Sequence, residues 1–270
     1  MFKIELEYPT SSKNAPRYTP ENTNKYIERA LAENNDSYYT LLATFKKYFY
    51  QLSKIDACAD ENSSLPYYIN PFLPGLDTVS LYCIIAENKP ATYLEIGSGN
   101  STKFARKAIA NNKLNTRIIS IDPYPRAEID QLCDEVIRMP LEEIKLDVFD
   151  NLLENDIVFF DGSHRCFMNS DVTTLFIDIM PRLKQGVYLH IHDIFWPIDY
   201  PLEWKERYYN EQYLLGSLLA NGLENYELIL PNFYVSLKTE LLKLLEPLWT
   251  SNKDFKDVAK HGCSFWMRKK

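Results

Sequence analysis

The sequence predicts an α/β protein in which a doubly wound, mainly parallel sheet carries helices on both faces and is preceded by a helical extension. From Pro90 onward, apolar runs of strand length alternate with longer stretches of helical periodicity. Such alternation is typical of parallel strands joined by right-handed crossovers. Before Pro90 the apolar residues recur only at helical spacing, which indicates helices without strands.

The N-terminal part is expected to be an arm followed by helices. Residues 1–20 hold three prolines and many small polar residues, which favours irregular structure. Residues 21–54 predict two helices, and prolines between 66 and 74 interrupt the pattern before a helix over 77–87. We therefore expect an extension over 1–65 and a ligand-binding domain over 66–270.

The domain is expected to hold seven strands. Five lie in the alternating part, at 93–96, 117–121, 135–137, 156–160 and 187–191, and two near the end, at 226–230 and 264–267. Helices are expected at about 102–112, 126–133, 141–153, 168–184 and 238–247.

Composition excludes several classes of function. The 270 residues carry a formal net charge of −7, which provides no field to gather nucleic acid. The five cysteines are scattered and odd in number, and no signal-peptide pattern or 18-residue apolar run occurs. We expect a cytoplasmic protein without nucleic-acid or membrane partners, and the choice between a monomer and a homo-oligomer stays open.

A glycine turn follows the first strand of the series. Gly97 and Gly99 stand two and four residues after Glu95, and Ser101 opens the next helix. Ligands of doubly wound sheets bind at the carboxyl ends of strands, where glycine lets the backbone approach them. Thr102 occupies the place of the third glycine of dinucleotide sites. The string favours a nucleoside cofactor over a plain tight turn.

An acidic residue ends the second strand. Asp122 lies 27 residues after Glu95, where a carboxylate can accept hydrogen bonds from both ribose hydroxyls of an adenosine. Alone, an aspartate before Pro123 would equally well start a turn. Its pairing with the glycine turn favours the ribose interpretation.

Four strings in order carry a family resemblance: Tyr-Leu-Glu-Ile-Gly-Ser-Gly at 93–99, Ser-Ile-Asp-Pro at 120–123, Phe-Asp-Gly-Ser-His at 160–164 and His-Asp-Ile at 192–194. Over residues 66–235 the chain resembles the class I methyltransferases that use S-adenosylmethionine (SAM), and it is similar to methyltransferase family 24. The resemblance implies a seven-stranded Rossmann-like sheet, a transferase activity and SAM as cofactor.

The resemblance also implies roles for individual residues. Those matching Glu95, Gly97 and Gly99 contact the methionine part of SAM, and the one matching Asp122 holds the ribose. The region 140–142, with Leu141 at its centre, would flank the adenine. Ser101 and Asp161 complete the candidate cofactor-binding set.

Histidines and carboxylates gather at the ends of the fourth and fifth strands. Asp161 and His164 follow one strand, and His192 and Asp193 follow the other, so all four should converge beside the cofactor's methyl group. Three interpretations stay open: acid–base or substrate-binding use of His164 or His192 beside Asp161, a metal site, or a structural hydrogen-bond network.

The metal interpretation comes from the resemblance. Relatives that methylate sugar hydroxyls hold magnesium with carboxylates at positions matching Asp161, His192 and Asp193. His192 stands where a carboxylate is expected, so the site suits Mg less well and Mn, Fe or Zn better.

The acceptor is expected to be a small molecule, methylated on the oxygen of a sugar or natural-product hydroxyl, with nitrogen as the other option. Two other classes stay open: an NAD- or nucleotide-sugar-dependent oxidoreductase, and a non-catalytic SAM-fold binding protein. The aromatic loop 194–201 either covers the cleft or packs as core.

Overall fold

The computed structural model of the protein describes residues 7–8, 15–60, 63–125 and 128–270. Seven strands form one sheet in the order β3-β2-β1-β4-β5-β7-β6. The strands are β1 (Thr92–Ile96), β2 (Arg117–Ile121), β3 (Glu135–Ile137), β4 (Ile157–Phe160), β5 (Tyr188–Ile191), β6 (Tyr226–Pro231) and β7 (Phe265–Lys269). The expected α/β fold with seven strands is confirmed.

The first five strands are parallel, and β7 runs antiparallel between β5 and β6. Because β1 lies between β2 and β4, the chain leaves β1 in one direction along the sheet and later returns to its other side. This reversal of strand order is the switch point at which ligands of such sheets bind. The carboxyl ends of β1, β2, β4 and β5 meet there.

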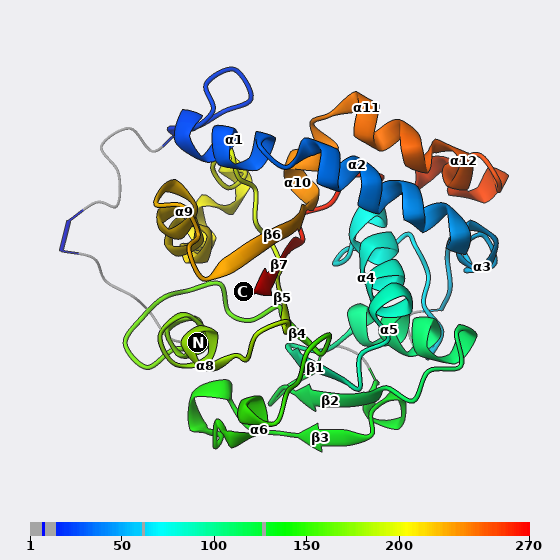
Figure 1. Cartoon of the computed structure of the whole chain (residues 1–270), viewed down its shortest axis with the longest axis horizontal. Helices are drawn as coiled ribbons and strands as arrows, with labels where there is room; N and C mark the ends of the chain where they lie inside the picture. The colour runs from blue at the N-terminus through cyan, green and yellow to red at the C-terminus, as the bar shows by residue number, and fades with distance from the viewer. Residues whose placement is uncertain (1–6, 9–14, 61–62, 126–127) are drawn as a thin grey trace.

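Helices cover both faces of the sheet (Figure 1). On one side lie α4 (Gly75–Asn88) and α5 (Asn100–Asn111), which contact each other. On the other side lie α8 (Met180–Arg182) and α9 (Glu211–Ala220). Nearly every residue of α4 is buried, so this helix is part of the core and needs no amphipathic pattern.

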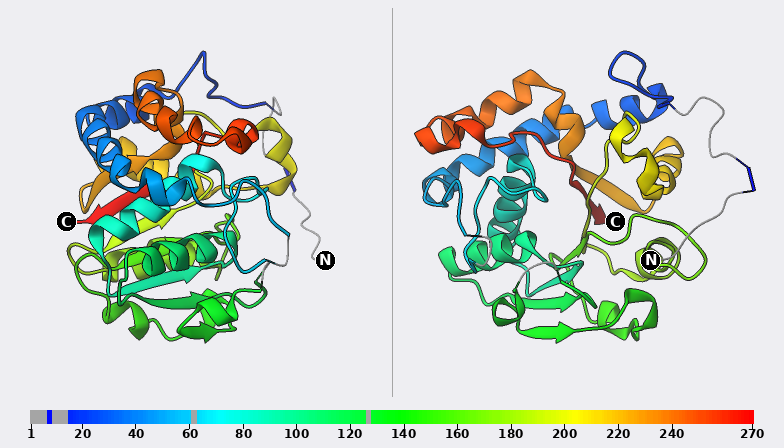
Figure 2. Two further views of the ribbon diagram at one scale, coloured as in Figure 1. Left: turned by 90° about the vertical axis from the view of Figure 1, so that its right-hand side faces the viewer. Right: turned by 180° about the vertical axis from the view of Figure 1, so that it is seen from behind.

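The N-terminal extension packs beside the last helices of the chain (Figure 2). It comprises α1 (Lys25–Ala32), α2 (Asn35–Thr44) and α3 (Phe49–Leu52), and the last helices are α10 (Asn232–Ser236), α11 (Thr239–Leu242) and α12 (Glu246–Trp249). Contacts join α2 to α11 and α3 to α12. Buried apolar residues from Ile27 to Met267 form one cluster, so extension and sheet share a core. The boundary at 65/66 stays a prediction.

Part of the expected arm over residues 1–20 lies outside the described residues. In the described part, the backbone N–H groups of Arg17 and Tyr18 donate to Asp199 Oδ2 at 2.6 and 3.0 Å. These bonds tie the end of the arm to the loop after β5.

Two expected helices are wrong in detail. Over 126–133, of which 126–127 lie outside the described residues, the chain forms only a 3-10 turn, Asp130–Leu132. Over 141–153 it forms a 3-10 turn, Leu141–Glu143, and then α6 (Asp147–Asp150). Ile144 is extended between them and packs against the core, so burial of this side chain overrides the helical pattern.

The expected helix over 168–184 begins later and is composite. It consists of α7 (Asp171–Thr173), a π-helical stretch (Thr174–Ile179) and α8. Ser170 sets its start, because its side chain accepts a hydrogen bond from the Thr173 N–H.

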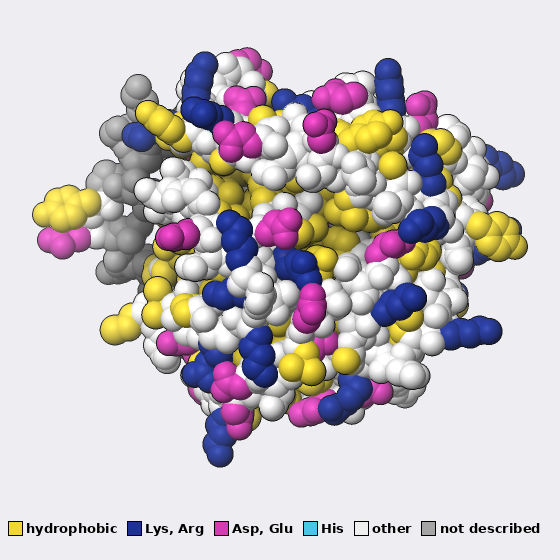
Figure 3. Space-filling view, viewed as in Figure 1, with side chains coloured by type: hydrophobic (Ala, Val, Ile, Leu, Met, Phe, Trp, Pro, Cys, Tyr) yellow, Lys and Arg dark blue, Asp and Glu magenta, His cyan; other side chains and the backbone are white. Residues whose placement is uncertain are grey.

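Basic and acidic side chains are interspersed on the face shown in Figure 3. Among the described residues, no helix is both long and apolar enough to cross a membrane.

Candidate active site

Gly97 makes the turn after β1 possible. Its φ is +77°, and a Cβ added there would lie 1.9 Å from the carbonyl oxygen of Asp161. Its N–H donates to the carbonyl of Ile121 on β2 at 3.1 Å. Both the left-handed conformation and the close approach of the β4 end therefore require glycine.

Gly99 differs from Gly97. Its φ of 175° is extended, and a Cβ there would meet no heavy atom within 4 Å. The fold places no steric demand on Gly99, so the open space beside it belongs to the cavity that this residue lines.

Glu95 lies beneath the turn and is fully buried. Its carboxylate accepts hydrogen bonds from the Tyr93 hydroxyl at 2.9 Å and from the Thr102 hydroxyl, and Thr102 Oγ1 accepts one from the Gly99 N–H at 3.1 Å. Burial raises the pKa of Glu95 to about 7, although hydrogen bonds from Ser101 and Thr102 lower it in part. Glu95 thus holds the turn together and does not itself line the cavity.

Asp122 joins the end of β2 to the glycine turn. Its Oδ2 accepts a hydrogen bond from the Ser98 N–H, and its Oδ1 accepts one from the Tyr124 N–H, both at 2.8 Å. Each carboxylate oxygen has a second lone pair for a further donor. The side chain faces the cavity already oriented by the backbone.

A cavity of about 1100 Å³ lies over the switch point. Ordinary small-molecule pockets measure about 300–1,000 Å³, so the cavity has room for a cofactor and an acceptor together. Among the sequence-predicted cofactor residues, those that line it are Gly97, Gly99, Ser101, Asp122, Leu141 and Asp161. Their contacts with SAM stay predictions.

The polar cluster at the ends of β4 and β5 assembles as expected, but most of it lies behind the cavity wall. Asp161 lines the cavity, whereas His164 and His192 are buried and are not among its lining residues. The ends of these strands are in register, because the Asp161 N–H donates to Ile96 and the His192 N–H donates to Phe160.

His164 bridges three carboxylates. Its Nε2 lies 3.2 Å from Asp161 Oδ1 and 3.5 Å from Asp193 Oδ2, and its Nδ1 lies 2.8 Å from Glu211 Oε2. Burial lowers the pKa of His164, but its hydrogen bonds to Asp161 and Glu211 outweigh burial and raise it well above the usual value. His164 is therefore a buried imidazolium between carboxylates.

His192 also lies among three carboxylates. Its Nδ1 is 3.4 Å from Asp193 Oδ1 and 3.7 Å from Asp161 Oδ1, and its Nε2 is 3.2 Å from Asp77 Oδ2. Burial lowers the pKa of His192, but the surrounding carboxylates outweigh it and raise the pKa to about 10. Asp77, in the first turn of α4, forms a hydrogen bond with Nε2 of this histidine.

Four residues near the site were not predicted from the sequence. Asp77, Glu211 and Cys263 lie far along the chain from the histidines that they contact. Lys103 is a cation in the cavity wall, buried and 5.9 Å from the centre of the Tyr67 ring. Burial lowers the pKa of Lys103. Its position on the helix after the glycine turn was the one signal available.

The aromatic loop after Asp193 packs inward. Phe195, Trp196 and Tyr200 are buried; Phe195 meets the Trp204 ring edge to face, and Tyr200 stacks on it. Trp196 Nε1 donates to the Gln212 carbonyl at 2.5 Å. The loop is core in this structure and follows Asp193 directly.

A glycine turn, an acidic residue at the end of the next strand and a large cavity at the switch point define a Rossmann-like protein that binds a nucleoside cofactor. Residues 94–194, which run from β1 to just beyond β5, match the model of methyltransferase family 24, described as a methyltransferase domain. This match supports a class I SAM-dependent methyltransferase. That match favours SAM over the oxidoreductase alternative and an enzyme over a non-catalytic binding protein.

Two solved structures are similar to the chain. A protein of Thermobifida fusca YX assigned as a methyltransferase shares 15% identity over 74% of this chain and 84% of its own, with a TM-score of 0.40. Coclaurine N-methyltransferase bound to N-methylheliamine and SAH shares 11% identity over 90% of this chain and 93% of its own, with a TM-score of 0.32. At these scores they add nothing to the family match. No curated protein matches the chain in sequence.

Proposed function

We propose that this enzyme methylates a hydroxyl oxygen of a small acceptor, such as a sugar or natural product, with Asp161 as the group that receives the hydroxyl proton. One observation carries the proposal: of the four clustered residues predicted at the ends of β4 and β5, Asp161 is the one that lines the cavity. A carboxylate in the wall of a cavity that holds both cofactor and acceptor is placed to orient the acceptor hydroxyl and to accept its proton.

When bound, SAM supplies a methyl group on a sulfonium that is an excellent leaving group. The chain's own residues then have to position the acceptor and manage one proton. Asp161 orients the hydroxyl, and His164 and His192 hold Asp161 from behind at 3.2 and 3.7 Å. Glu211 fixes the His164 ring through Nδ1. Proton removal by a well-placed base contributes about 10²–10⁴-fold to such reactions.

The metal alternative remains a prediction. Donor atoms of Asp161, His192 and Asp193 lie within 4.8 Å of one another, so a divalent ion fits by distance. However, His164 Nε2 lies between the same two carboxylates, and its positive charge competes with an ion there. We therefore propose that proton transfer depends on His164 and Asp161 rather than on a metal.

The test is an acceptor screen with hydroxyl and amine compounds, in which mass spectrometry detects the added methyl group. Asp161→Asn should lower turnover of a hydroxyl acceptor at least a hundredfold. The matched control is Asp134→Asn, since Asp134 lies outside the cavity lining. Amine methylation that Asp161→Asn leaves unchanged would assign nitrogen as the acceptor atom. Activity lost on chelation and restored by Mn²⁺ would support the metal.

A further inference from the structure

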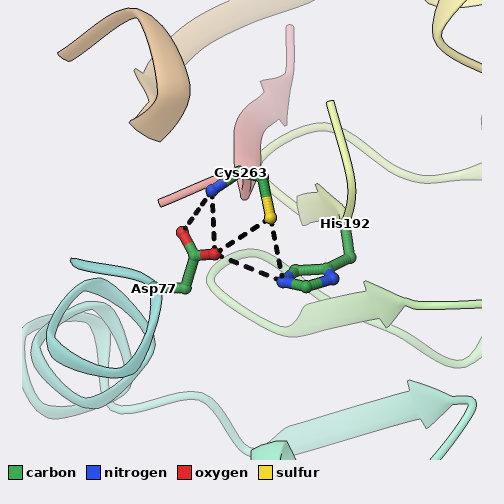
Figure 4. A group of neighbouring side chains, drawn as sticks. All are labelled: Asp77, His192 and Cys263. Atoms are coloured by element: carbon green, nitrogen blue, oxygen red, sulfur yellow. Dashed lines mark hydrogen bonds and ion pairs between the residues drawn. The ribbon is translucent and has the colours of Figure 1, made fainter. Parts of the chain in front are cut away.

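A second group of potential ligands lies on the far side of His192 from Asp161. It contains Asp77 in the first turn of α4, His192 directly after β5, and Cys263 two residues before β7 (Figure 4). All three side chains are buried, and their donor atoms face one another. We propose that Asp77 Oδ2, His192 Nε2 and Cys263 Sγ bind a zinc ion.

The distances between the three atoms match a tetrahedral ion. Asp77 Oδ2 is 3.2 Å from His192 Nε2 and 3.4 Å from Cys263 Sγ, and Sγ is 3.6 Å from Nε2. In tetrahedral zinc sites, bonds of about 2.0–2.1 Å to nitrogen and oxygen and about 2.3 Å to sulfur place neighbouring ligands about 3.3–3.6 Å apart. The three measured distances follow the same pattern, with those to sulfur the longer.

The ligand types select the metal. A thiolate and an imidazole suit zinc, whereas magnesium and calcium prefer sets of oxygen ligands. Three protein ligands leave the fourth position of a tetrahedral ion to water. The proposed zinc site uses Nε2 of His192. The candidate metal site with Asp161 would use the other ring nitrogen, Nδ1.

Neighbouring groups form hydrogen bonds to the proposed ligands and orient them, as is usual around metal sites. Asp77 Oδ1 accepts hydrogen bonds from Asn232 Nδ2 at 2.7 Å and from the Ser264 N–H at 2.9 Å. The other ring nitrogen of His192, Nδ1, lies 3.4 Å from Asp193 Oδ1, an oxygen that is also 3.3 Å from Cys263 Sγ. A carboxylate on the second nitrogen orients a metal-bound histidine and strengthens it as a ligand.

The competing explanation is a network without an ion. Protonated His192 Nε2 and the Cys263 thiol can both donate to Asp77 Oδ2, and zinc would replace these two protons. In that network the Cys263 thiol donates to Asp77 Oδ2 or to Asp193 Oδ1, at 3.4 and 3.3 Å, and its sulfur is a weak acceptor 3.6 Å from His192 Nε2. Zinc binds all three atoms at once and links the start of α4, the end of β5 and the segment before β7.

The test uses the purified full-length chain, stripped of metal and titrated with Zn²⁺ and Co²⁺. Wild type should bind one ion per chain at this site, and the Co²⁺ form should show a thiolate-to-metal charge-transfer absorption. Cys263→Ser should remove that absorption and weaken zinc binding at least tenfold, and Asp77→Asn should also weaken it. Cys83→Ser is the matched control, because Cys83 is a buried cysteine on the same helix as Asp77 and should leave both measurements unchanged.

Circular dichroism and SAH binding show whether each variant is folded. Wild-type protein that binds no Zn²⁺ or Co²⁺, or that binds Co²⁺ without a thiolate absorption, overturns the proposal whatever the variants do. An absorption that survives in Cys263→Ser also overturns it. This inference does not rest on the proposed reaction, because an ion on Asp161, His192 and Asp193 would have no sulfur ligand and would persist in Cys263→Ser.

Discussion

The two glycines of the turn should respond in opposite ways to the same substitution. In Gly97→Ala the new methyl carbon would start 1.9 Å from the Asp161 carbonyl oxygen, so that separation must grow by about 1.5 Å to reach the 3.4 Å of ordinary contact. The left-handed conformation of Gly97 costs an alanine about 1–2 kcal/mol, and overpacking a close contact costs about 1–3 kcal/mol. The free energy of unfolding should therefore fall by about 2–5 kcal/mol.

For a chain of this size, each kcal/mol shifts the melting temperature by about 2–4 °C. Gly97→Ala should therefore melt roughly 4–20 °C below wild type in a calorimetric scan. Gly99→Ala, whose methyl group meets no protein atom within 4 Å, should keep its melting temperature within about 2 °C. Because Gly99 lines the cavity, this variant should instead lose affinity for SAH.

The comparison of the two variants can refute the reasoning. If both melt at the same temperature, the steric account of the turn is wrong. If Gly99→Ala binds SAH as tightly as wild type, the cofactor does not approach that part of the backbone.

Three further predictions concern the cofactor side of the cavity. Asp122→Ala should raise the calorimetric Kd for SAH at least tenfold, because hydrogen bonds to a charged group contribute about 1.5–3 kcal/mol each. The control Asp134→Ala, which removes a carboxylate that also accepts a backbone N–H, should leave this Kd unchanged. Equal effects of the two substitutions would remove the ribose assignment. Lys103 is a cation in the cavity wall, and we predict that it pairs with the carboxylate of the cofactor. Lys103→Met should therefore weaken the binding of SAH about tenfold and leave the binding of 5′-methylthioadenosine, which has no carboxylate, unchanged. Equal weakening of both would show that Lys103 does not bind this carboxylate. Burial raises the pKa of Glu95 from the ordinary 4.5 to about 7, so the native protein should lose stability as pH rises from about 4.5 to 7. Glu95→Gln should reduce this dependence of stability on pH. Melting temperatures that fall equally in wild type and Glu95→Gln between pH 5 and 7.5 would contradict this.

Features set by neighbouring residues could be predicted from the sequence. The glycine turn, Asp122 and the alternation of strands and helices depend on residues a few positions apart, since backbone conformation and hydrophobic periodicity are local. The convergence of Asp161, His164, His192 and Asp193 also followed, because parallel strands end at one edge of a sheet. Their roles in binding and catalysis remain predictions.

The sequence did not show which residues of the site line the cavity and which are buried behind its wall. Which side of the cavity wall a residue occupies depends on elements that pack there from elsewhere. Glu211, 47 residues after His164, and Asp77, 115 residues before His192, bring carboxylates to the histidines only after α9 and α4 have docked on the sheet. There the carboxylates outweigh burial and raise the pKa of both histidines.

The sequence by itself determined that this chain folds as a doubly wound sheet with a glycine turn after β1, because those features are encoded in short-range patterns. Only the tertiary structure decided that Asp161 faces the cavity while His164 and His192 lie behind it, and that Asp77, His192 and Cys263 meet in one buried cluster. The physical reason is that contacts between distant segments form when apolar faces bury each other, and no spacing along the chain records which faces those will be.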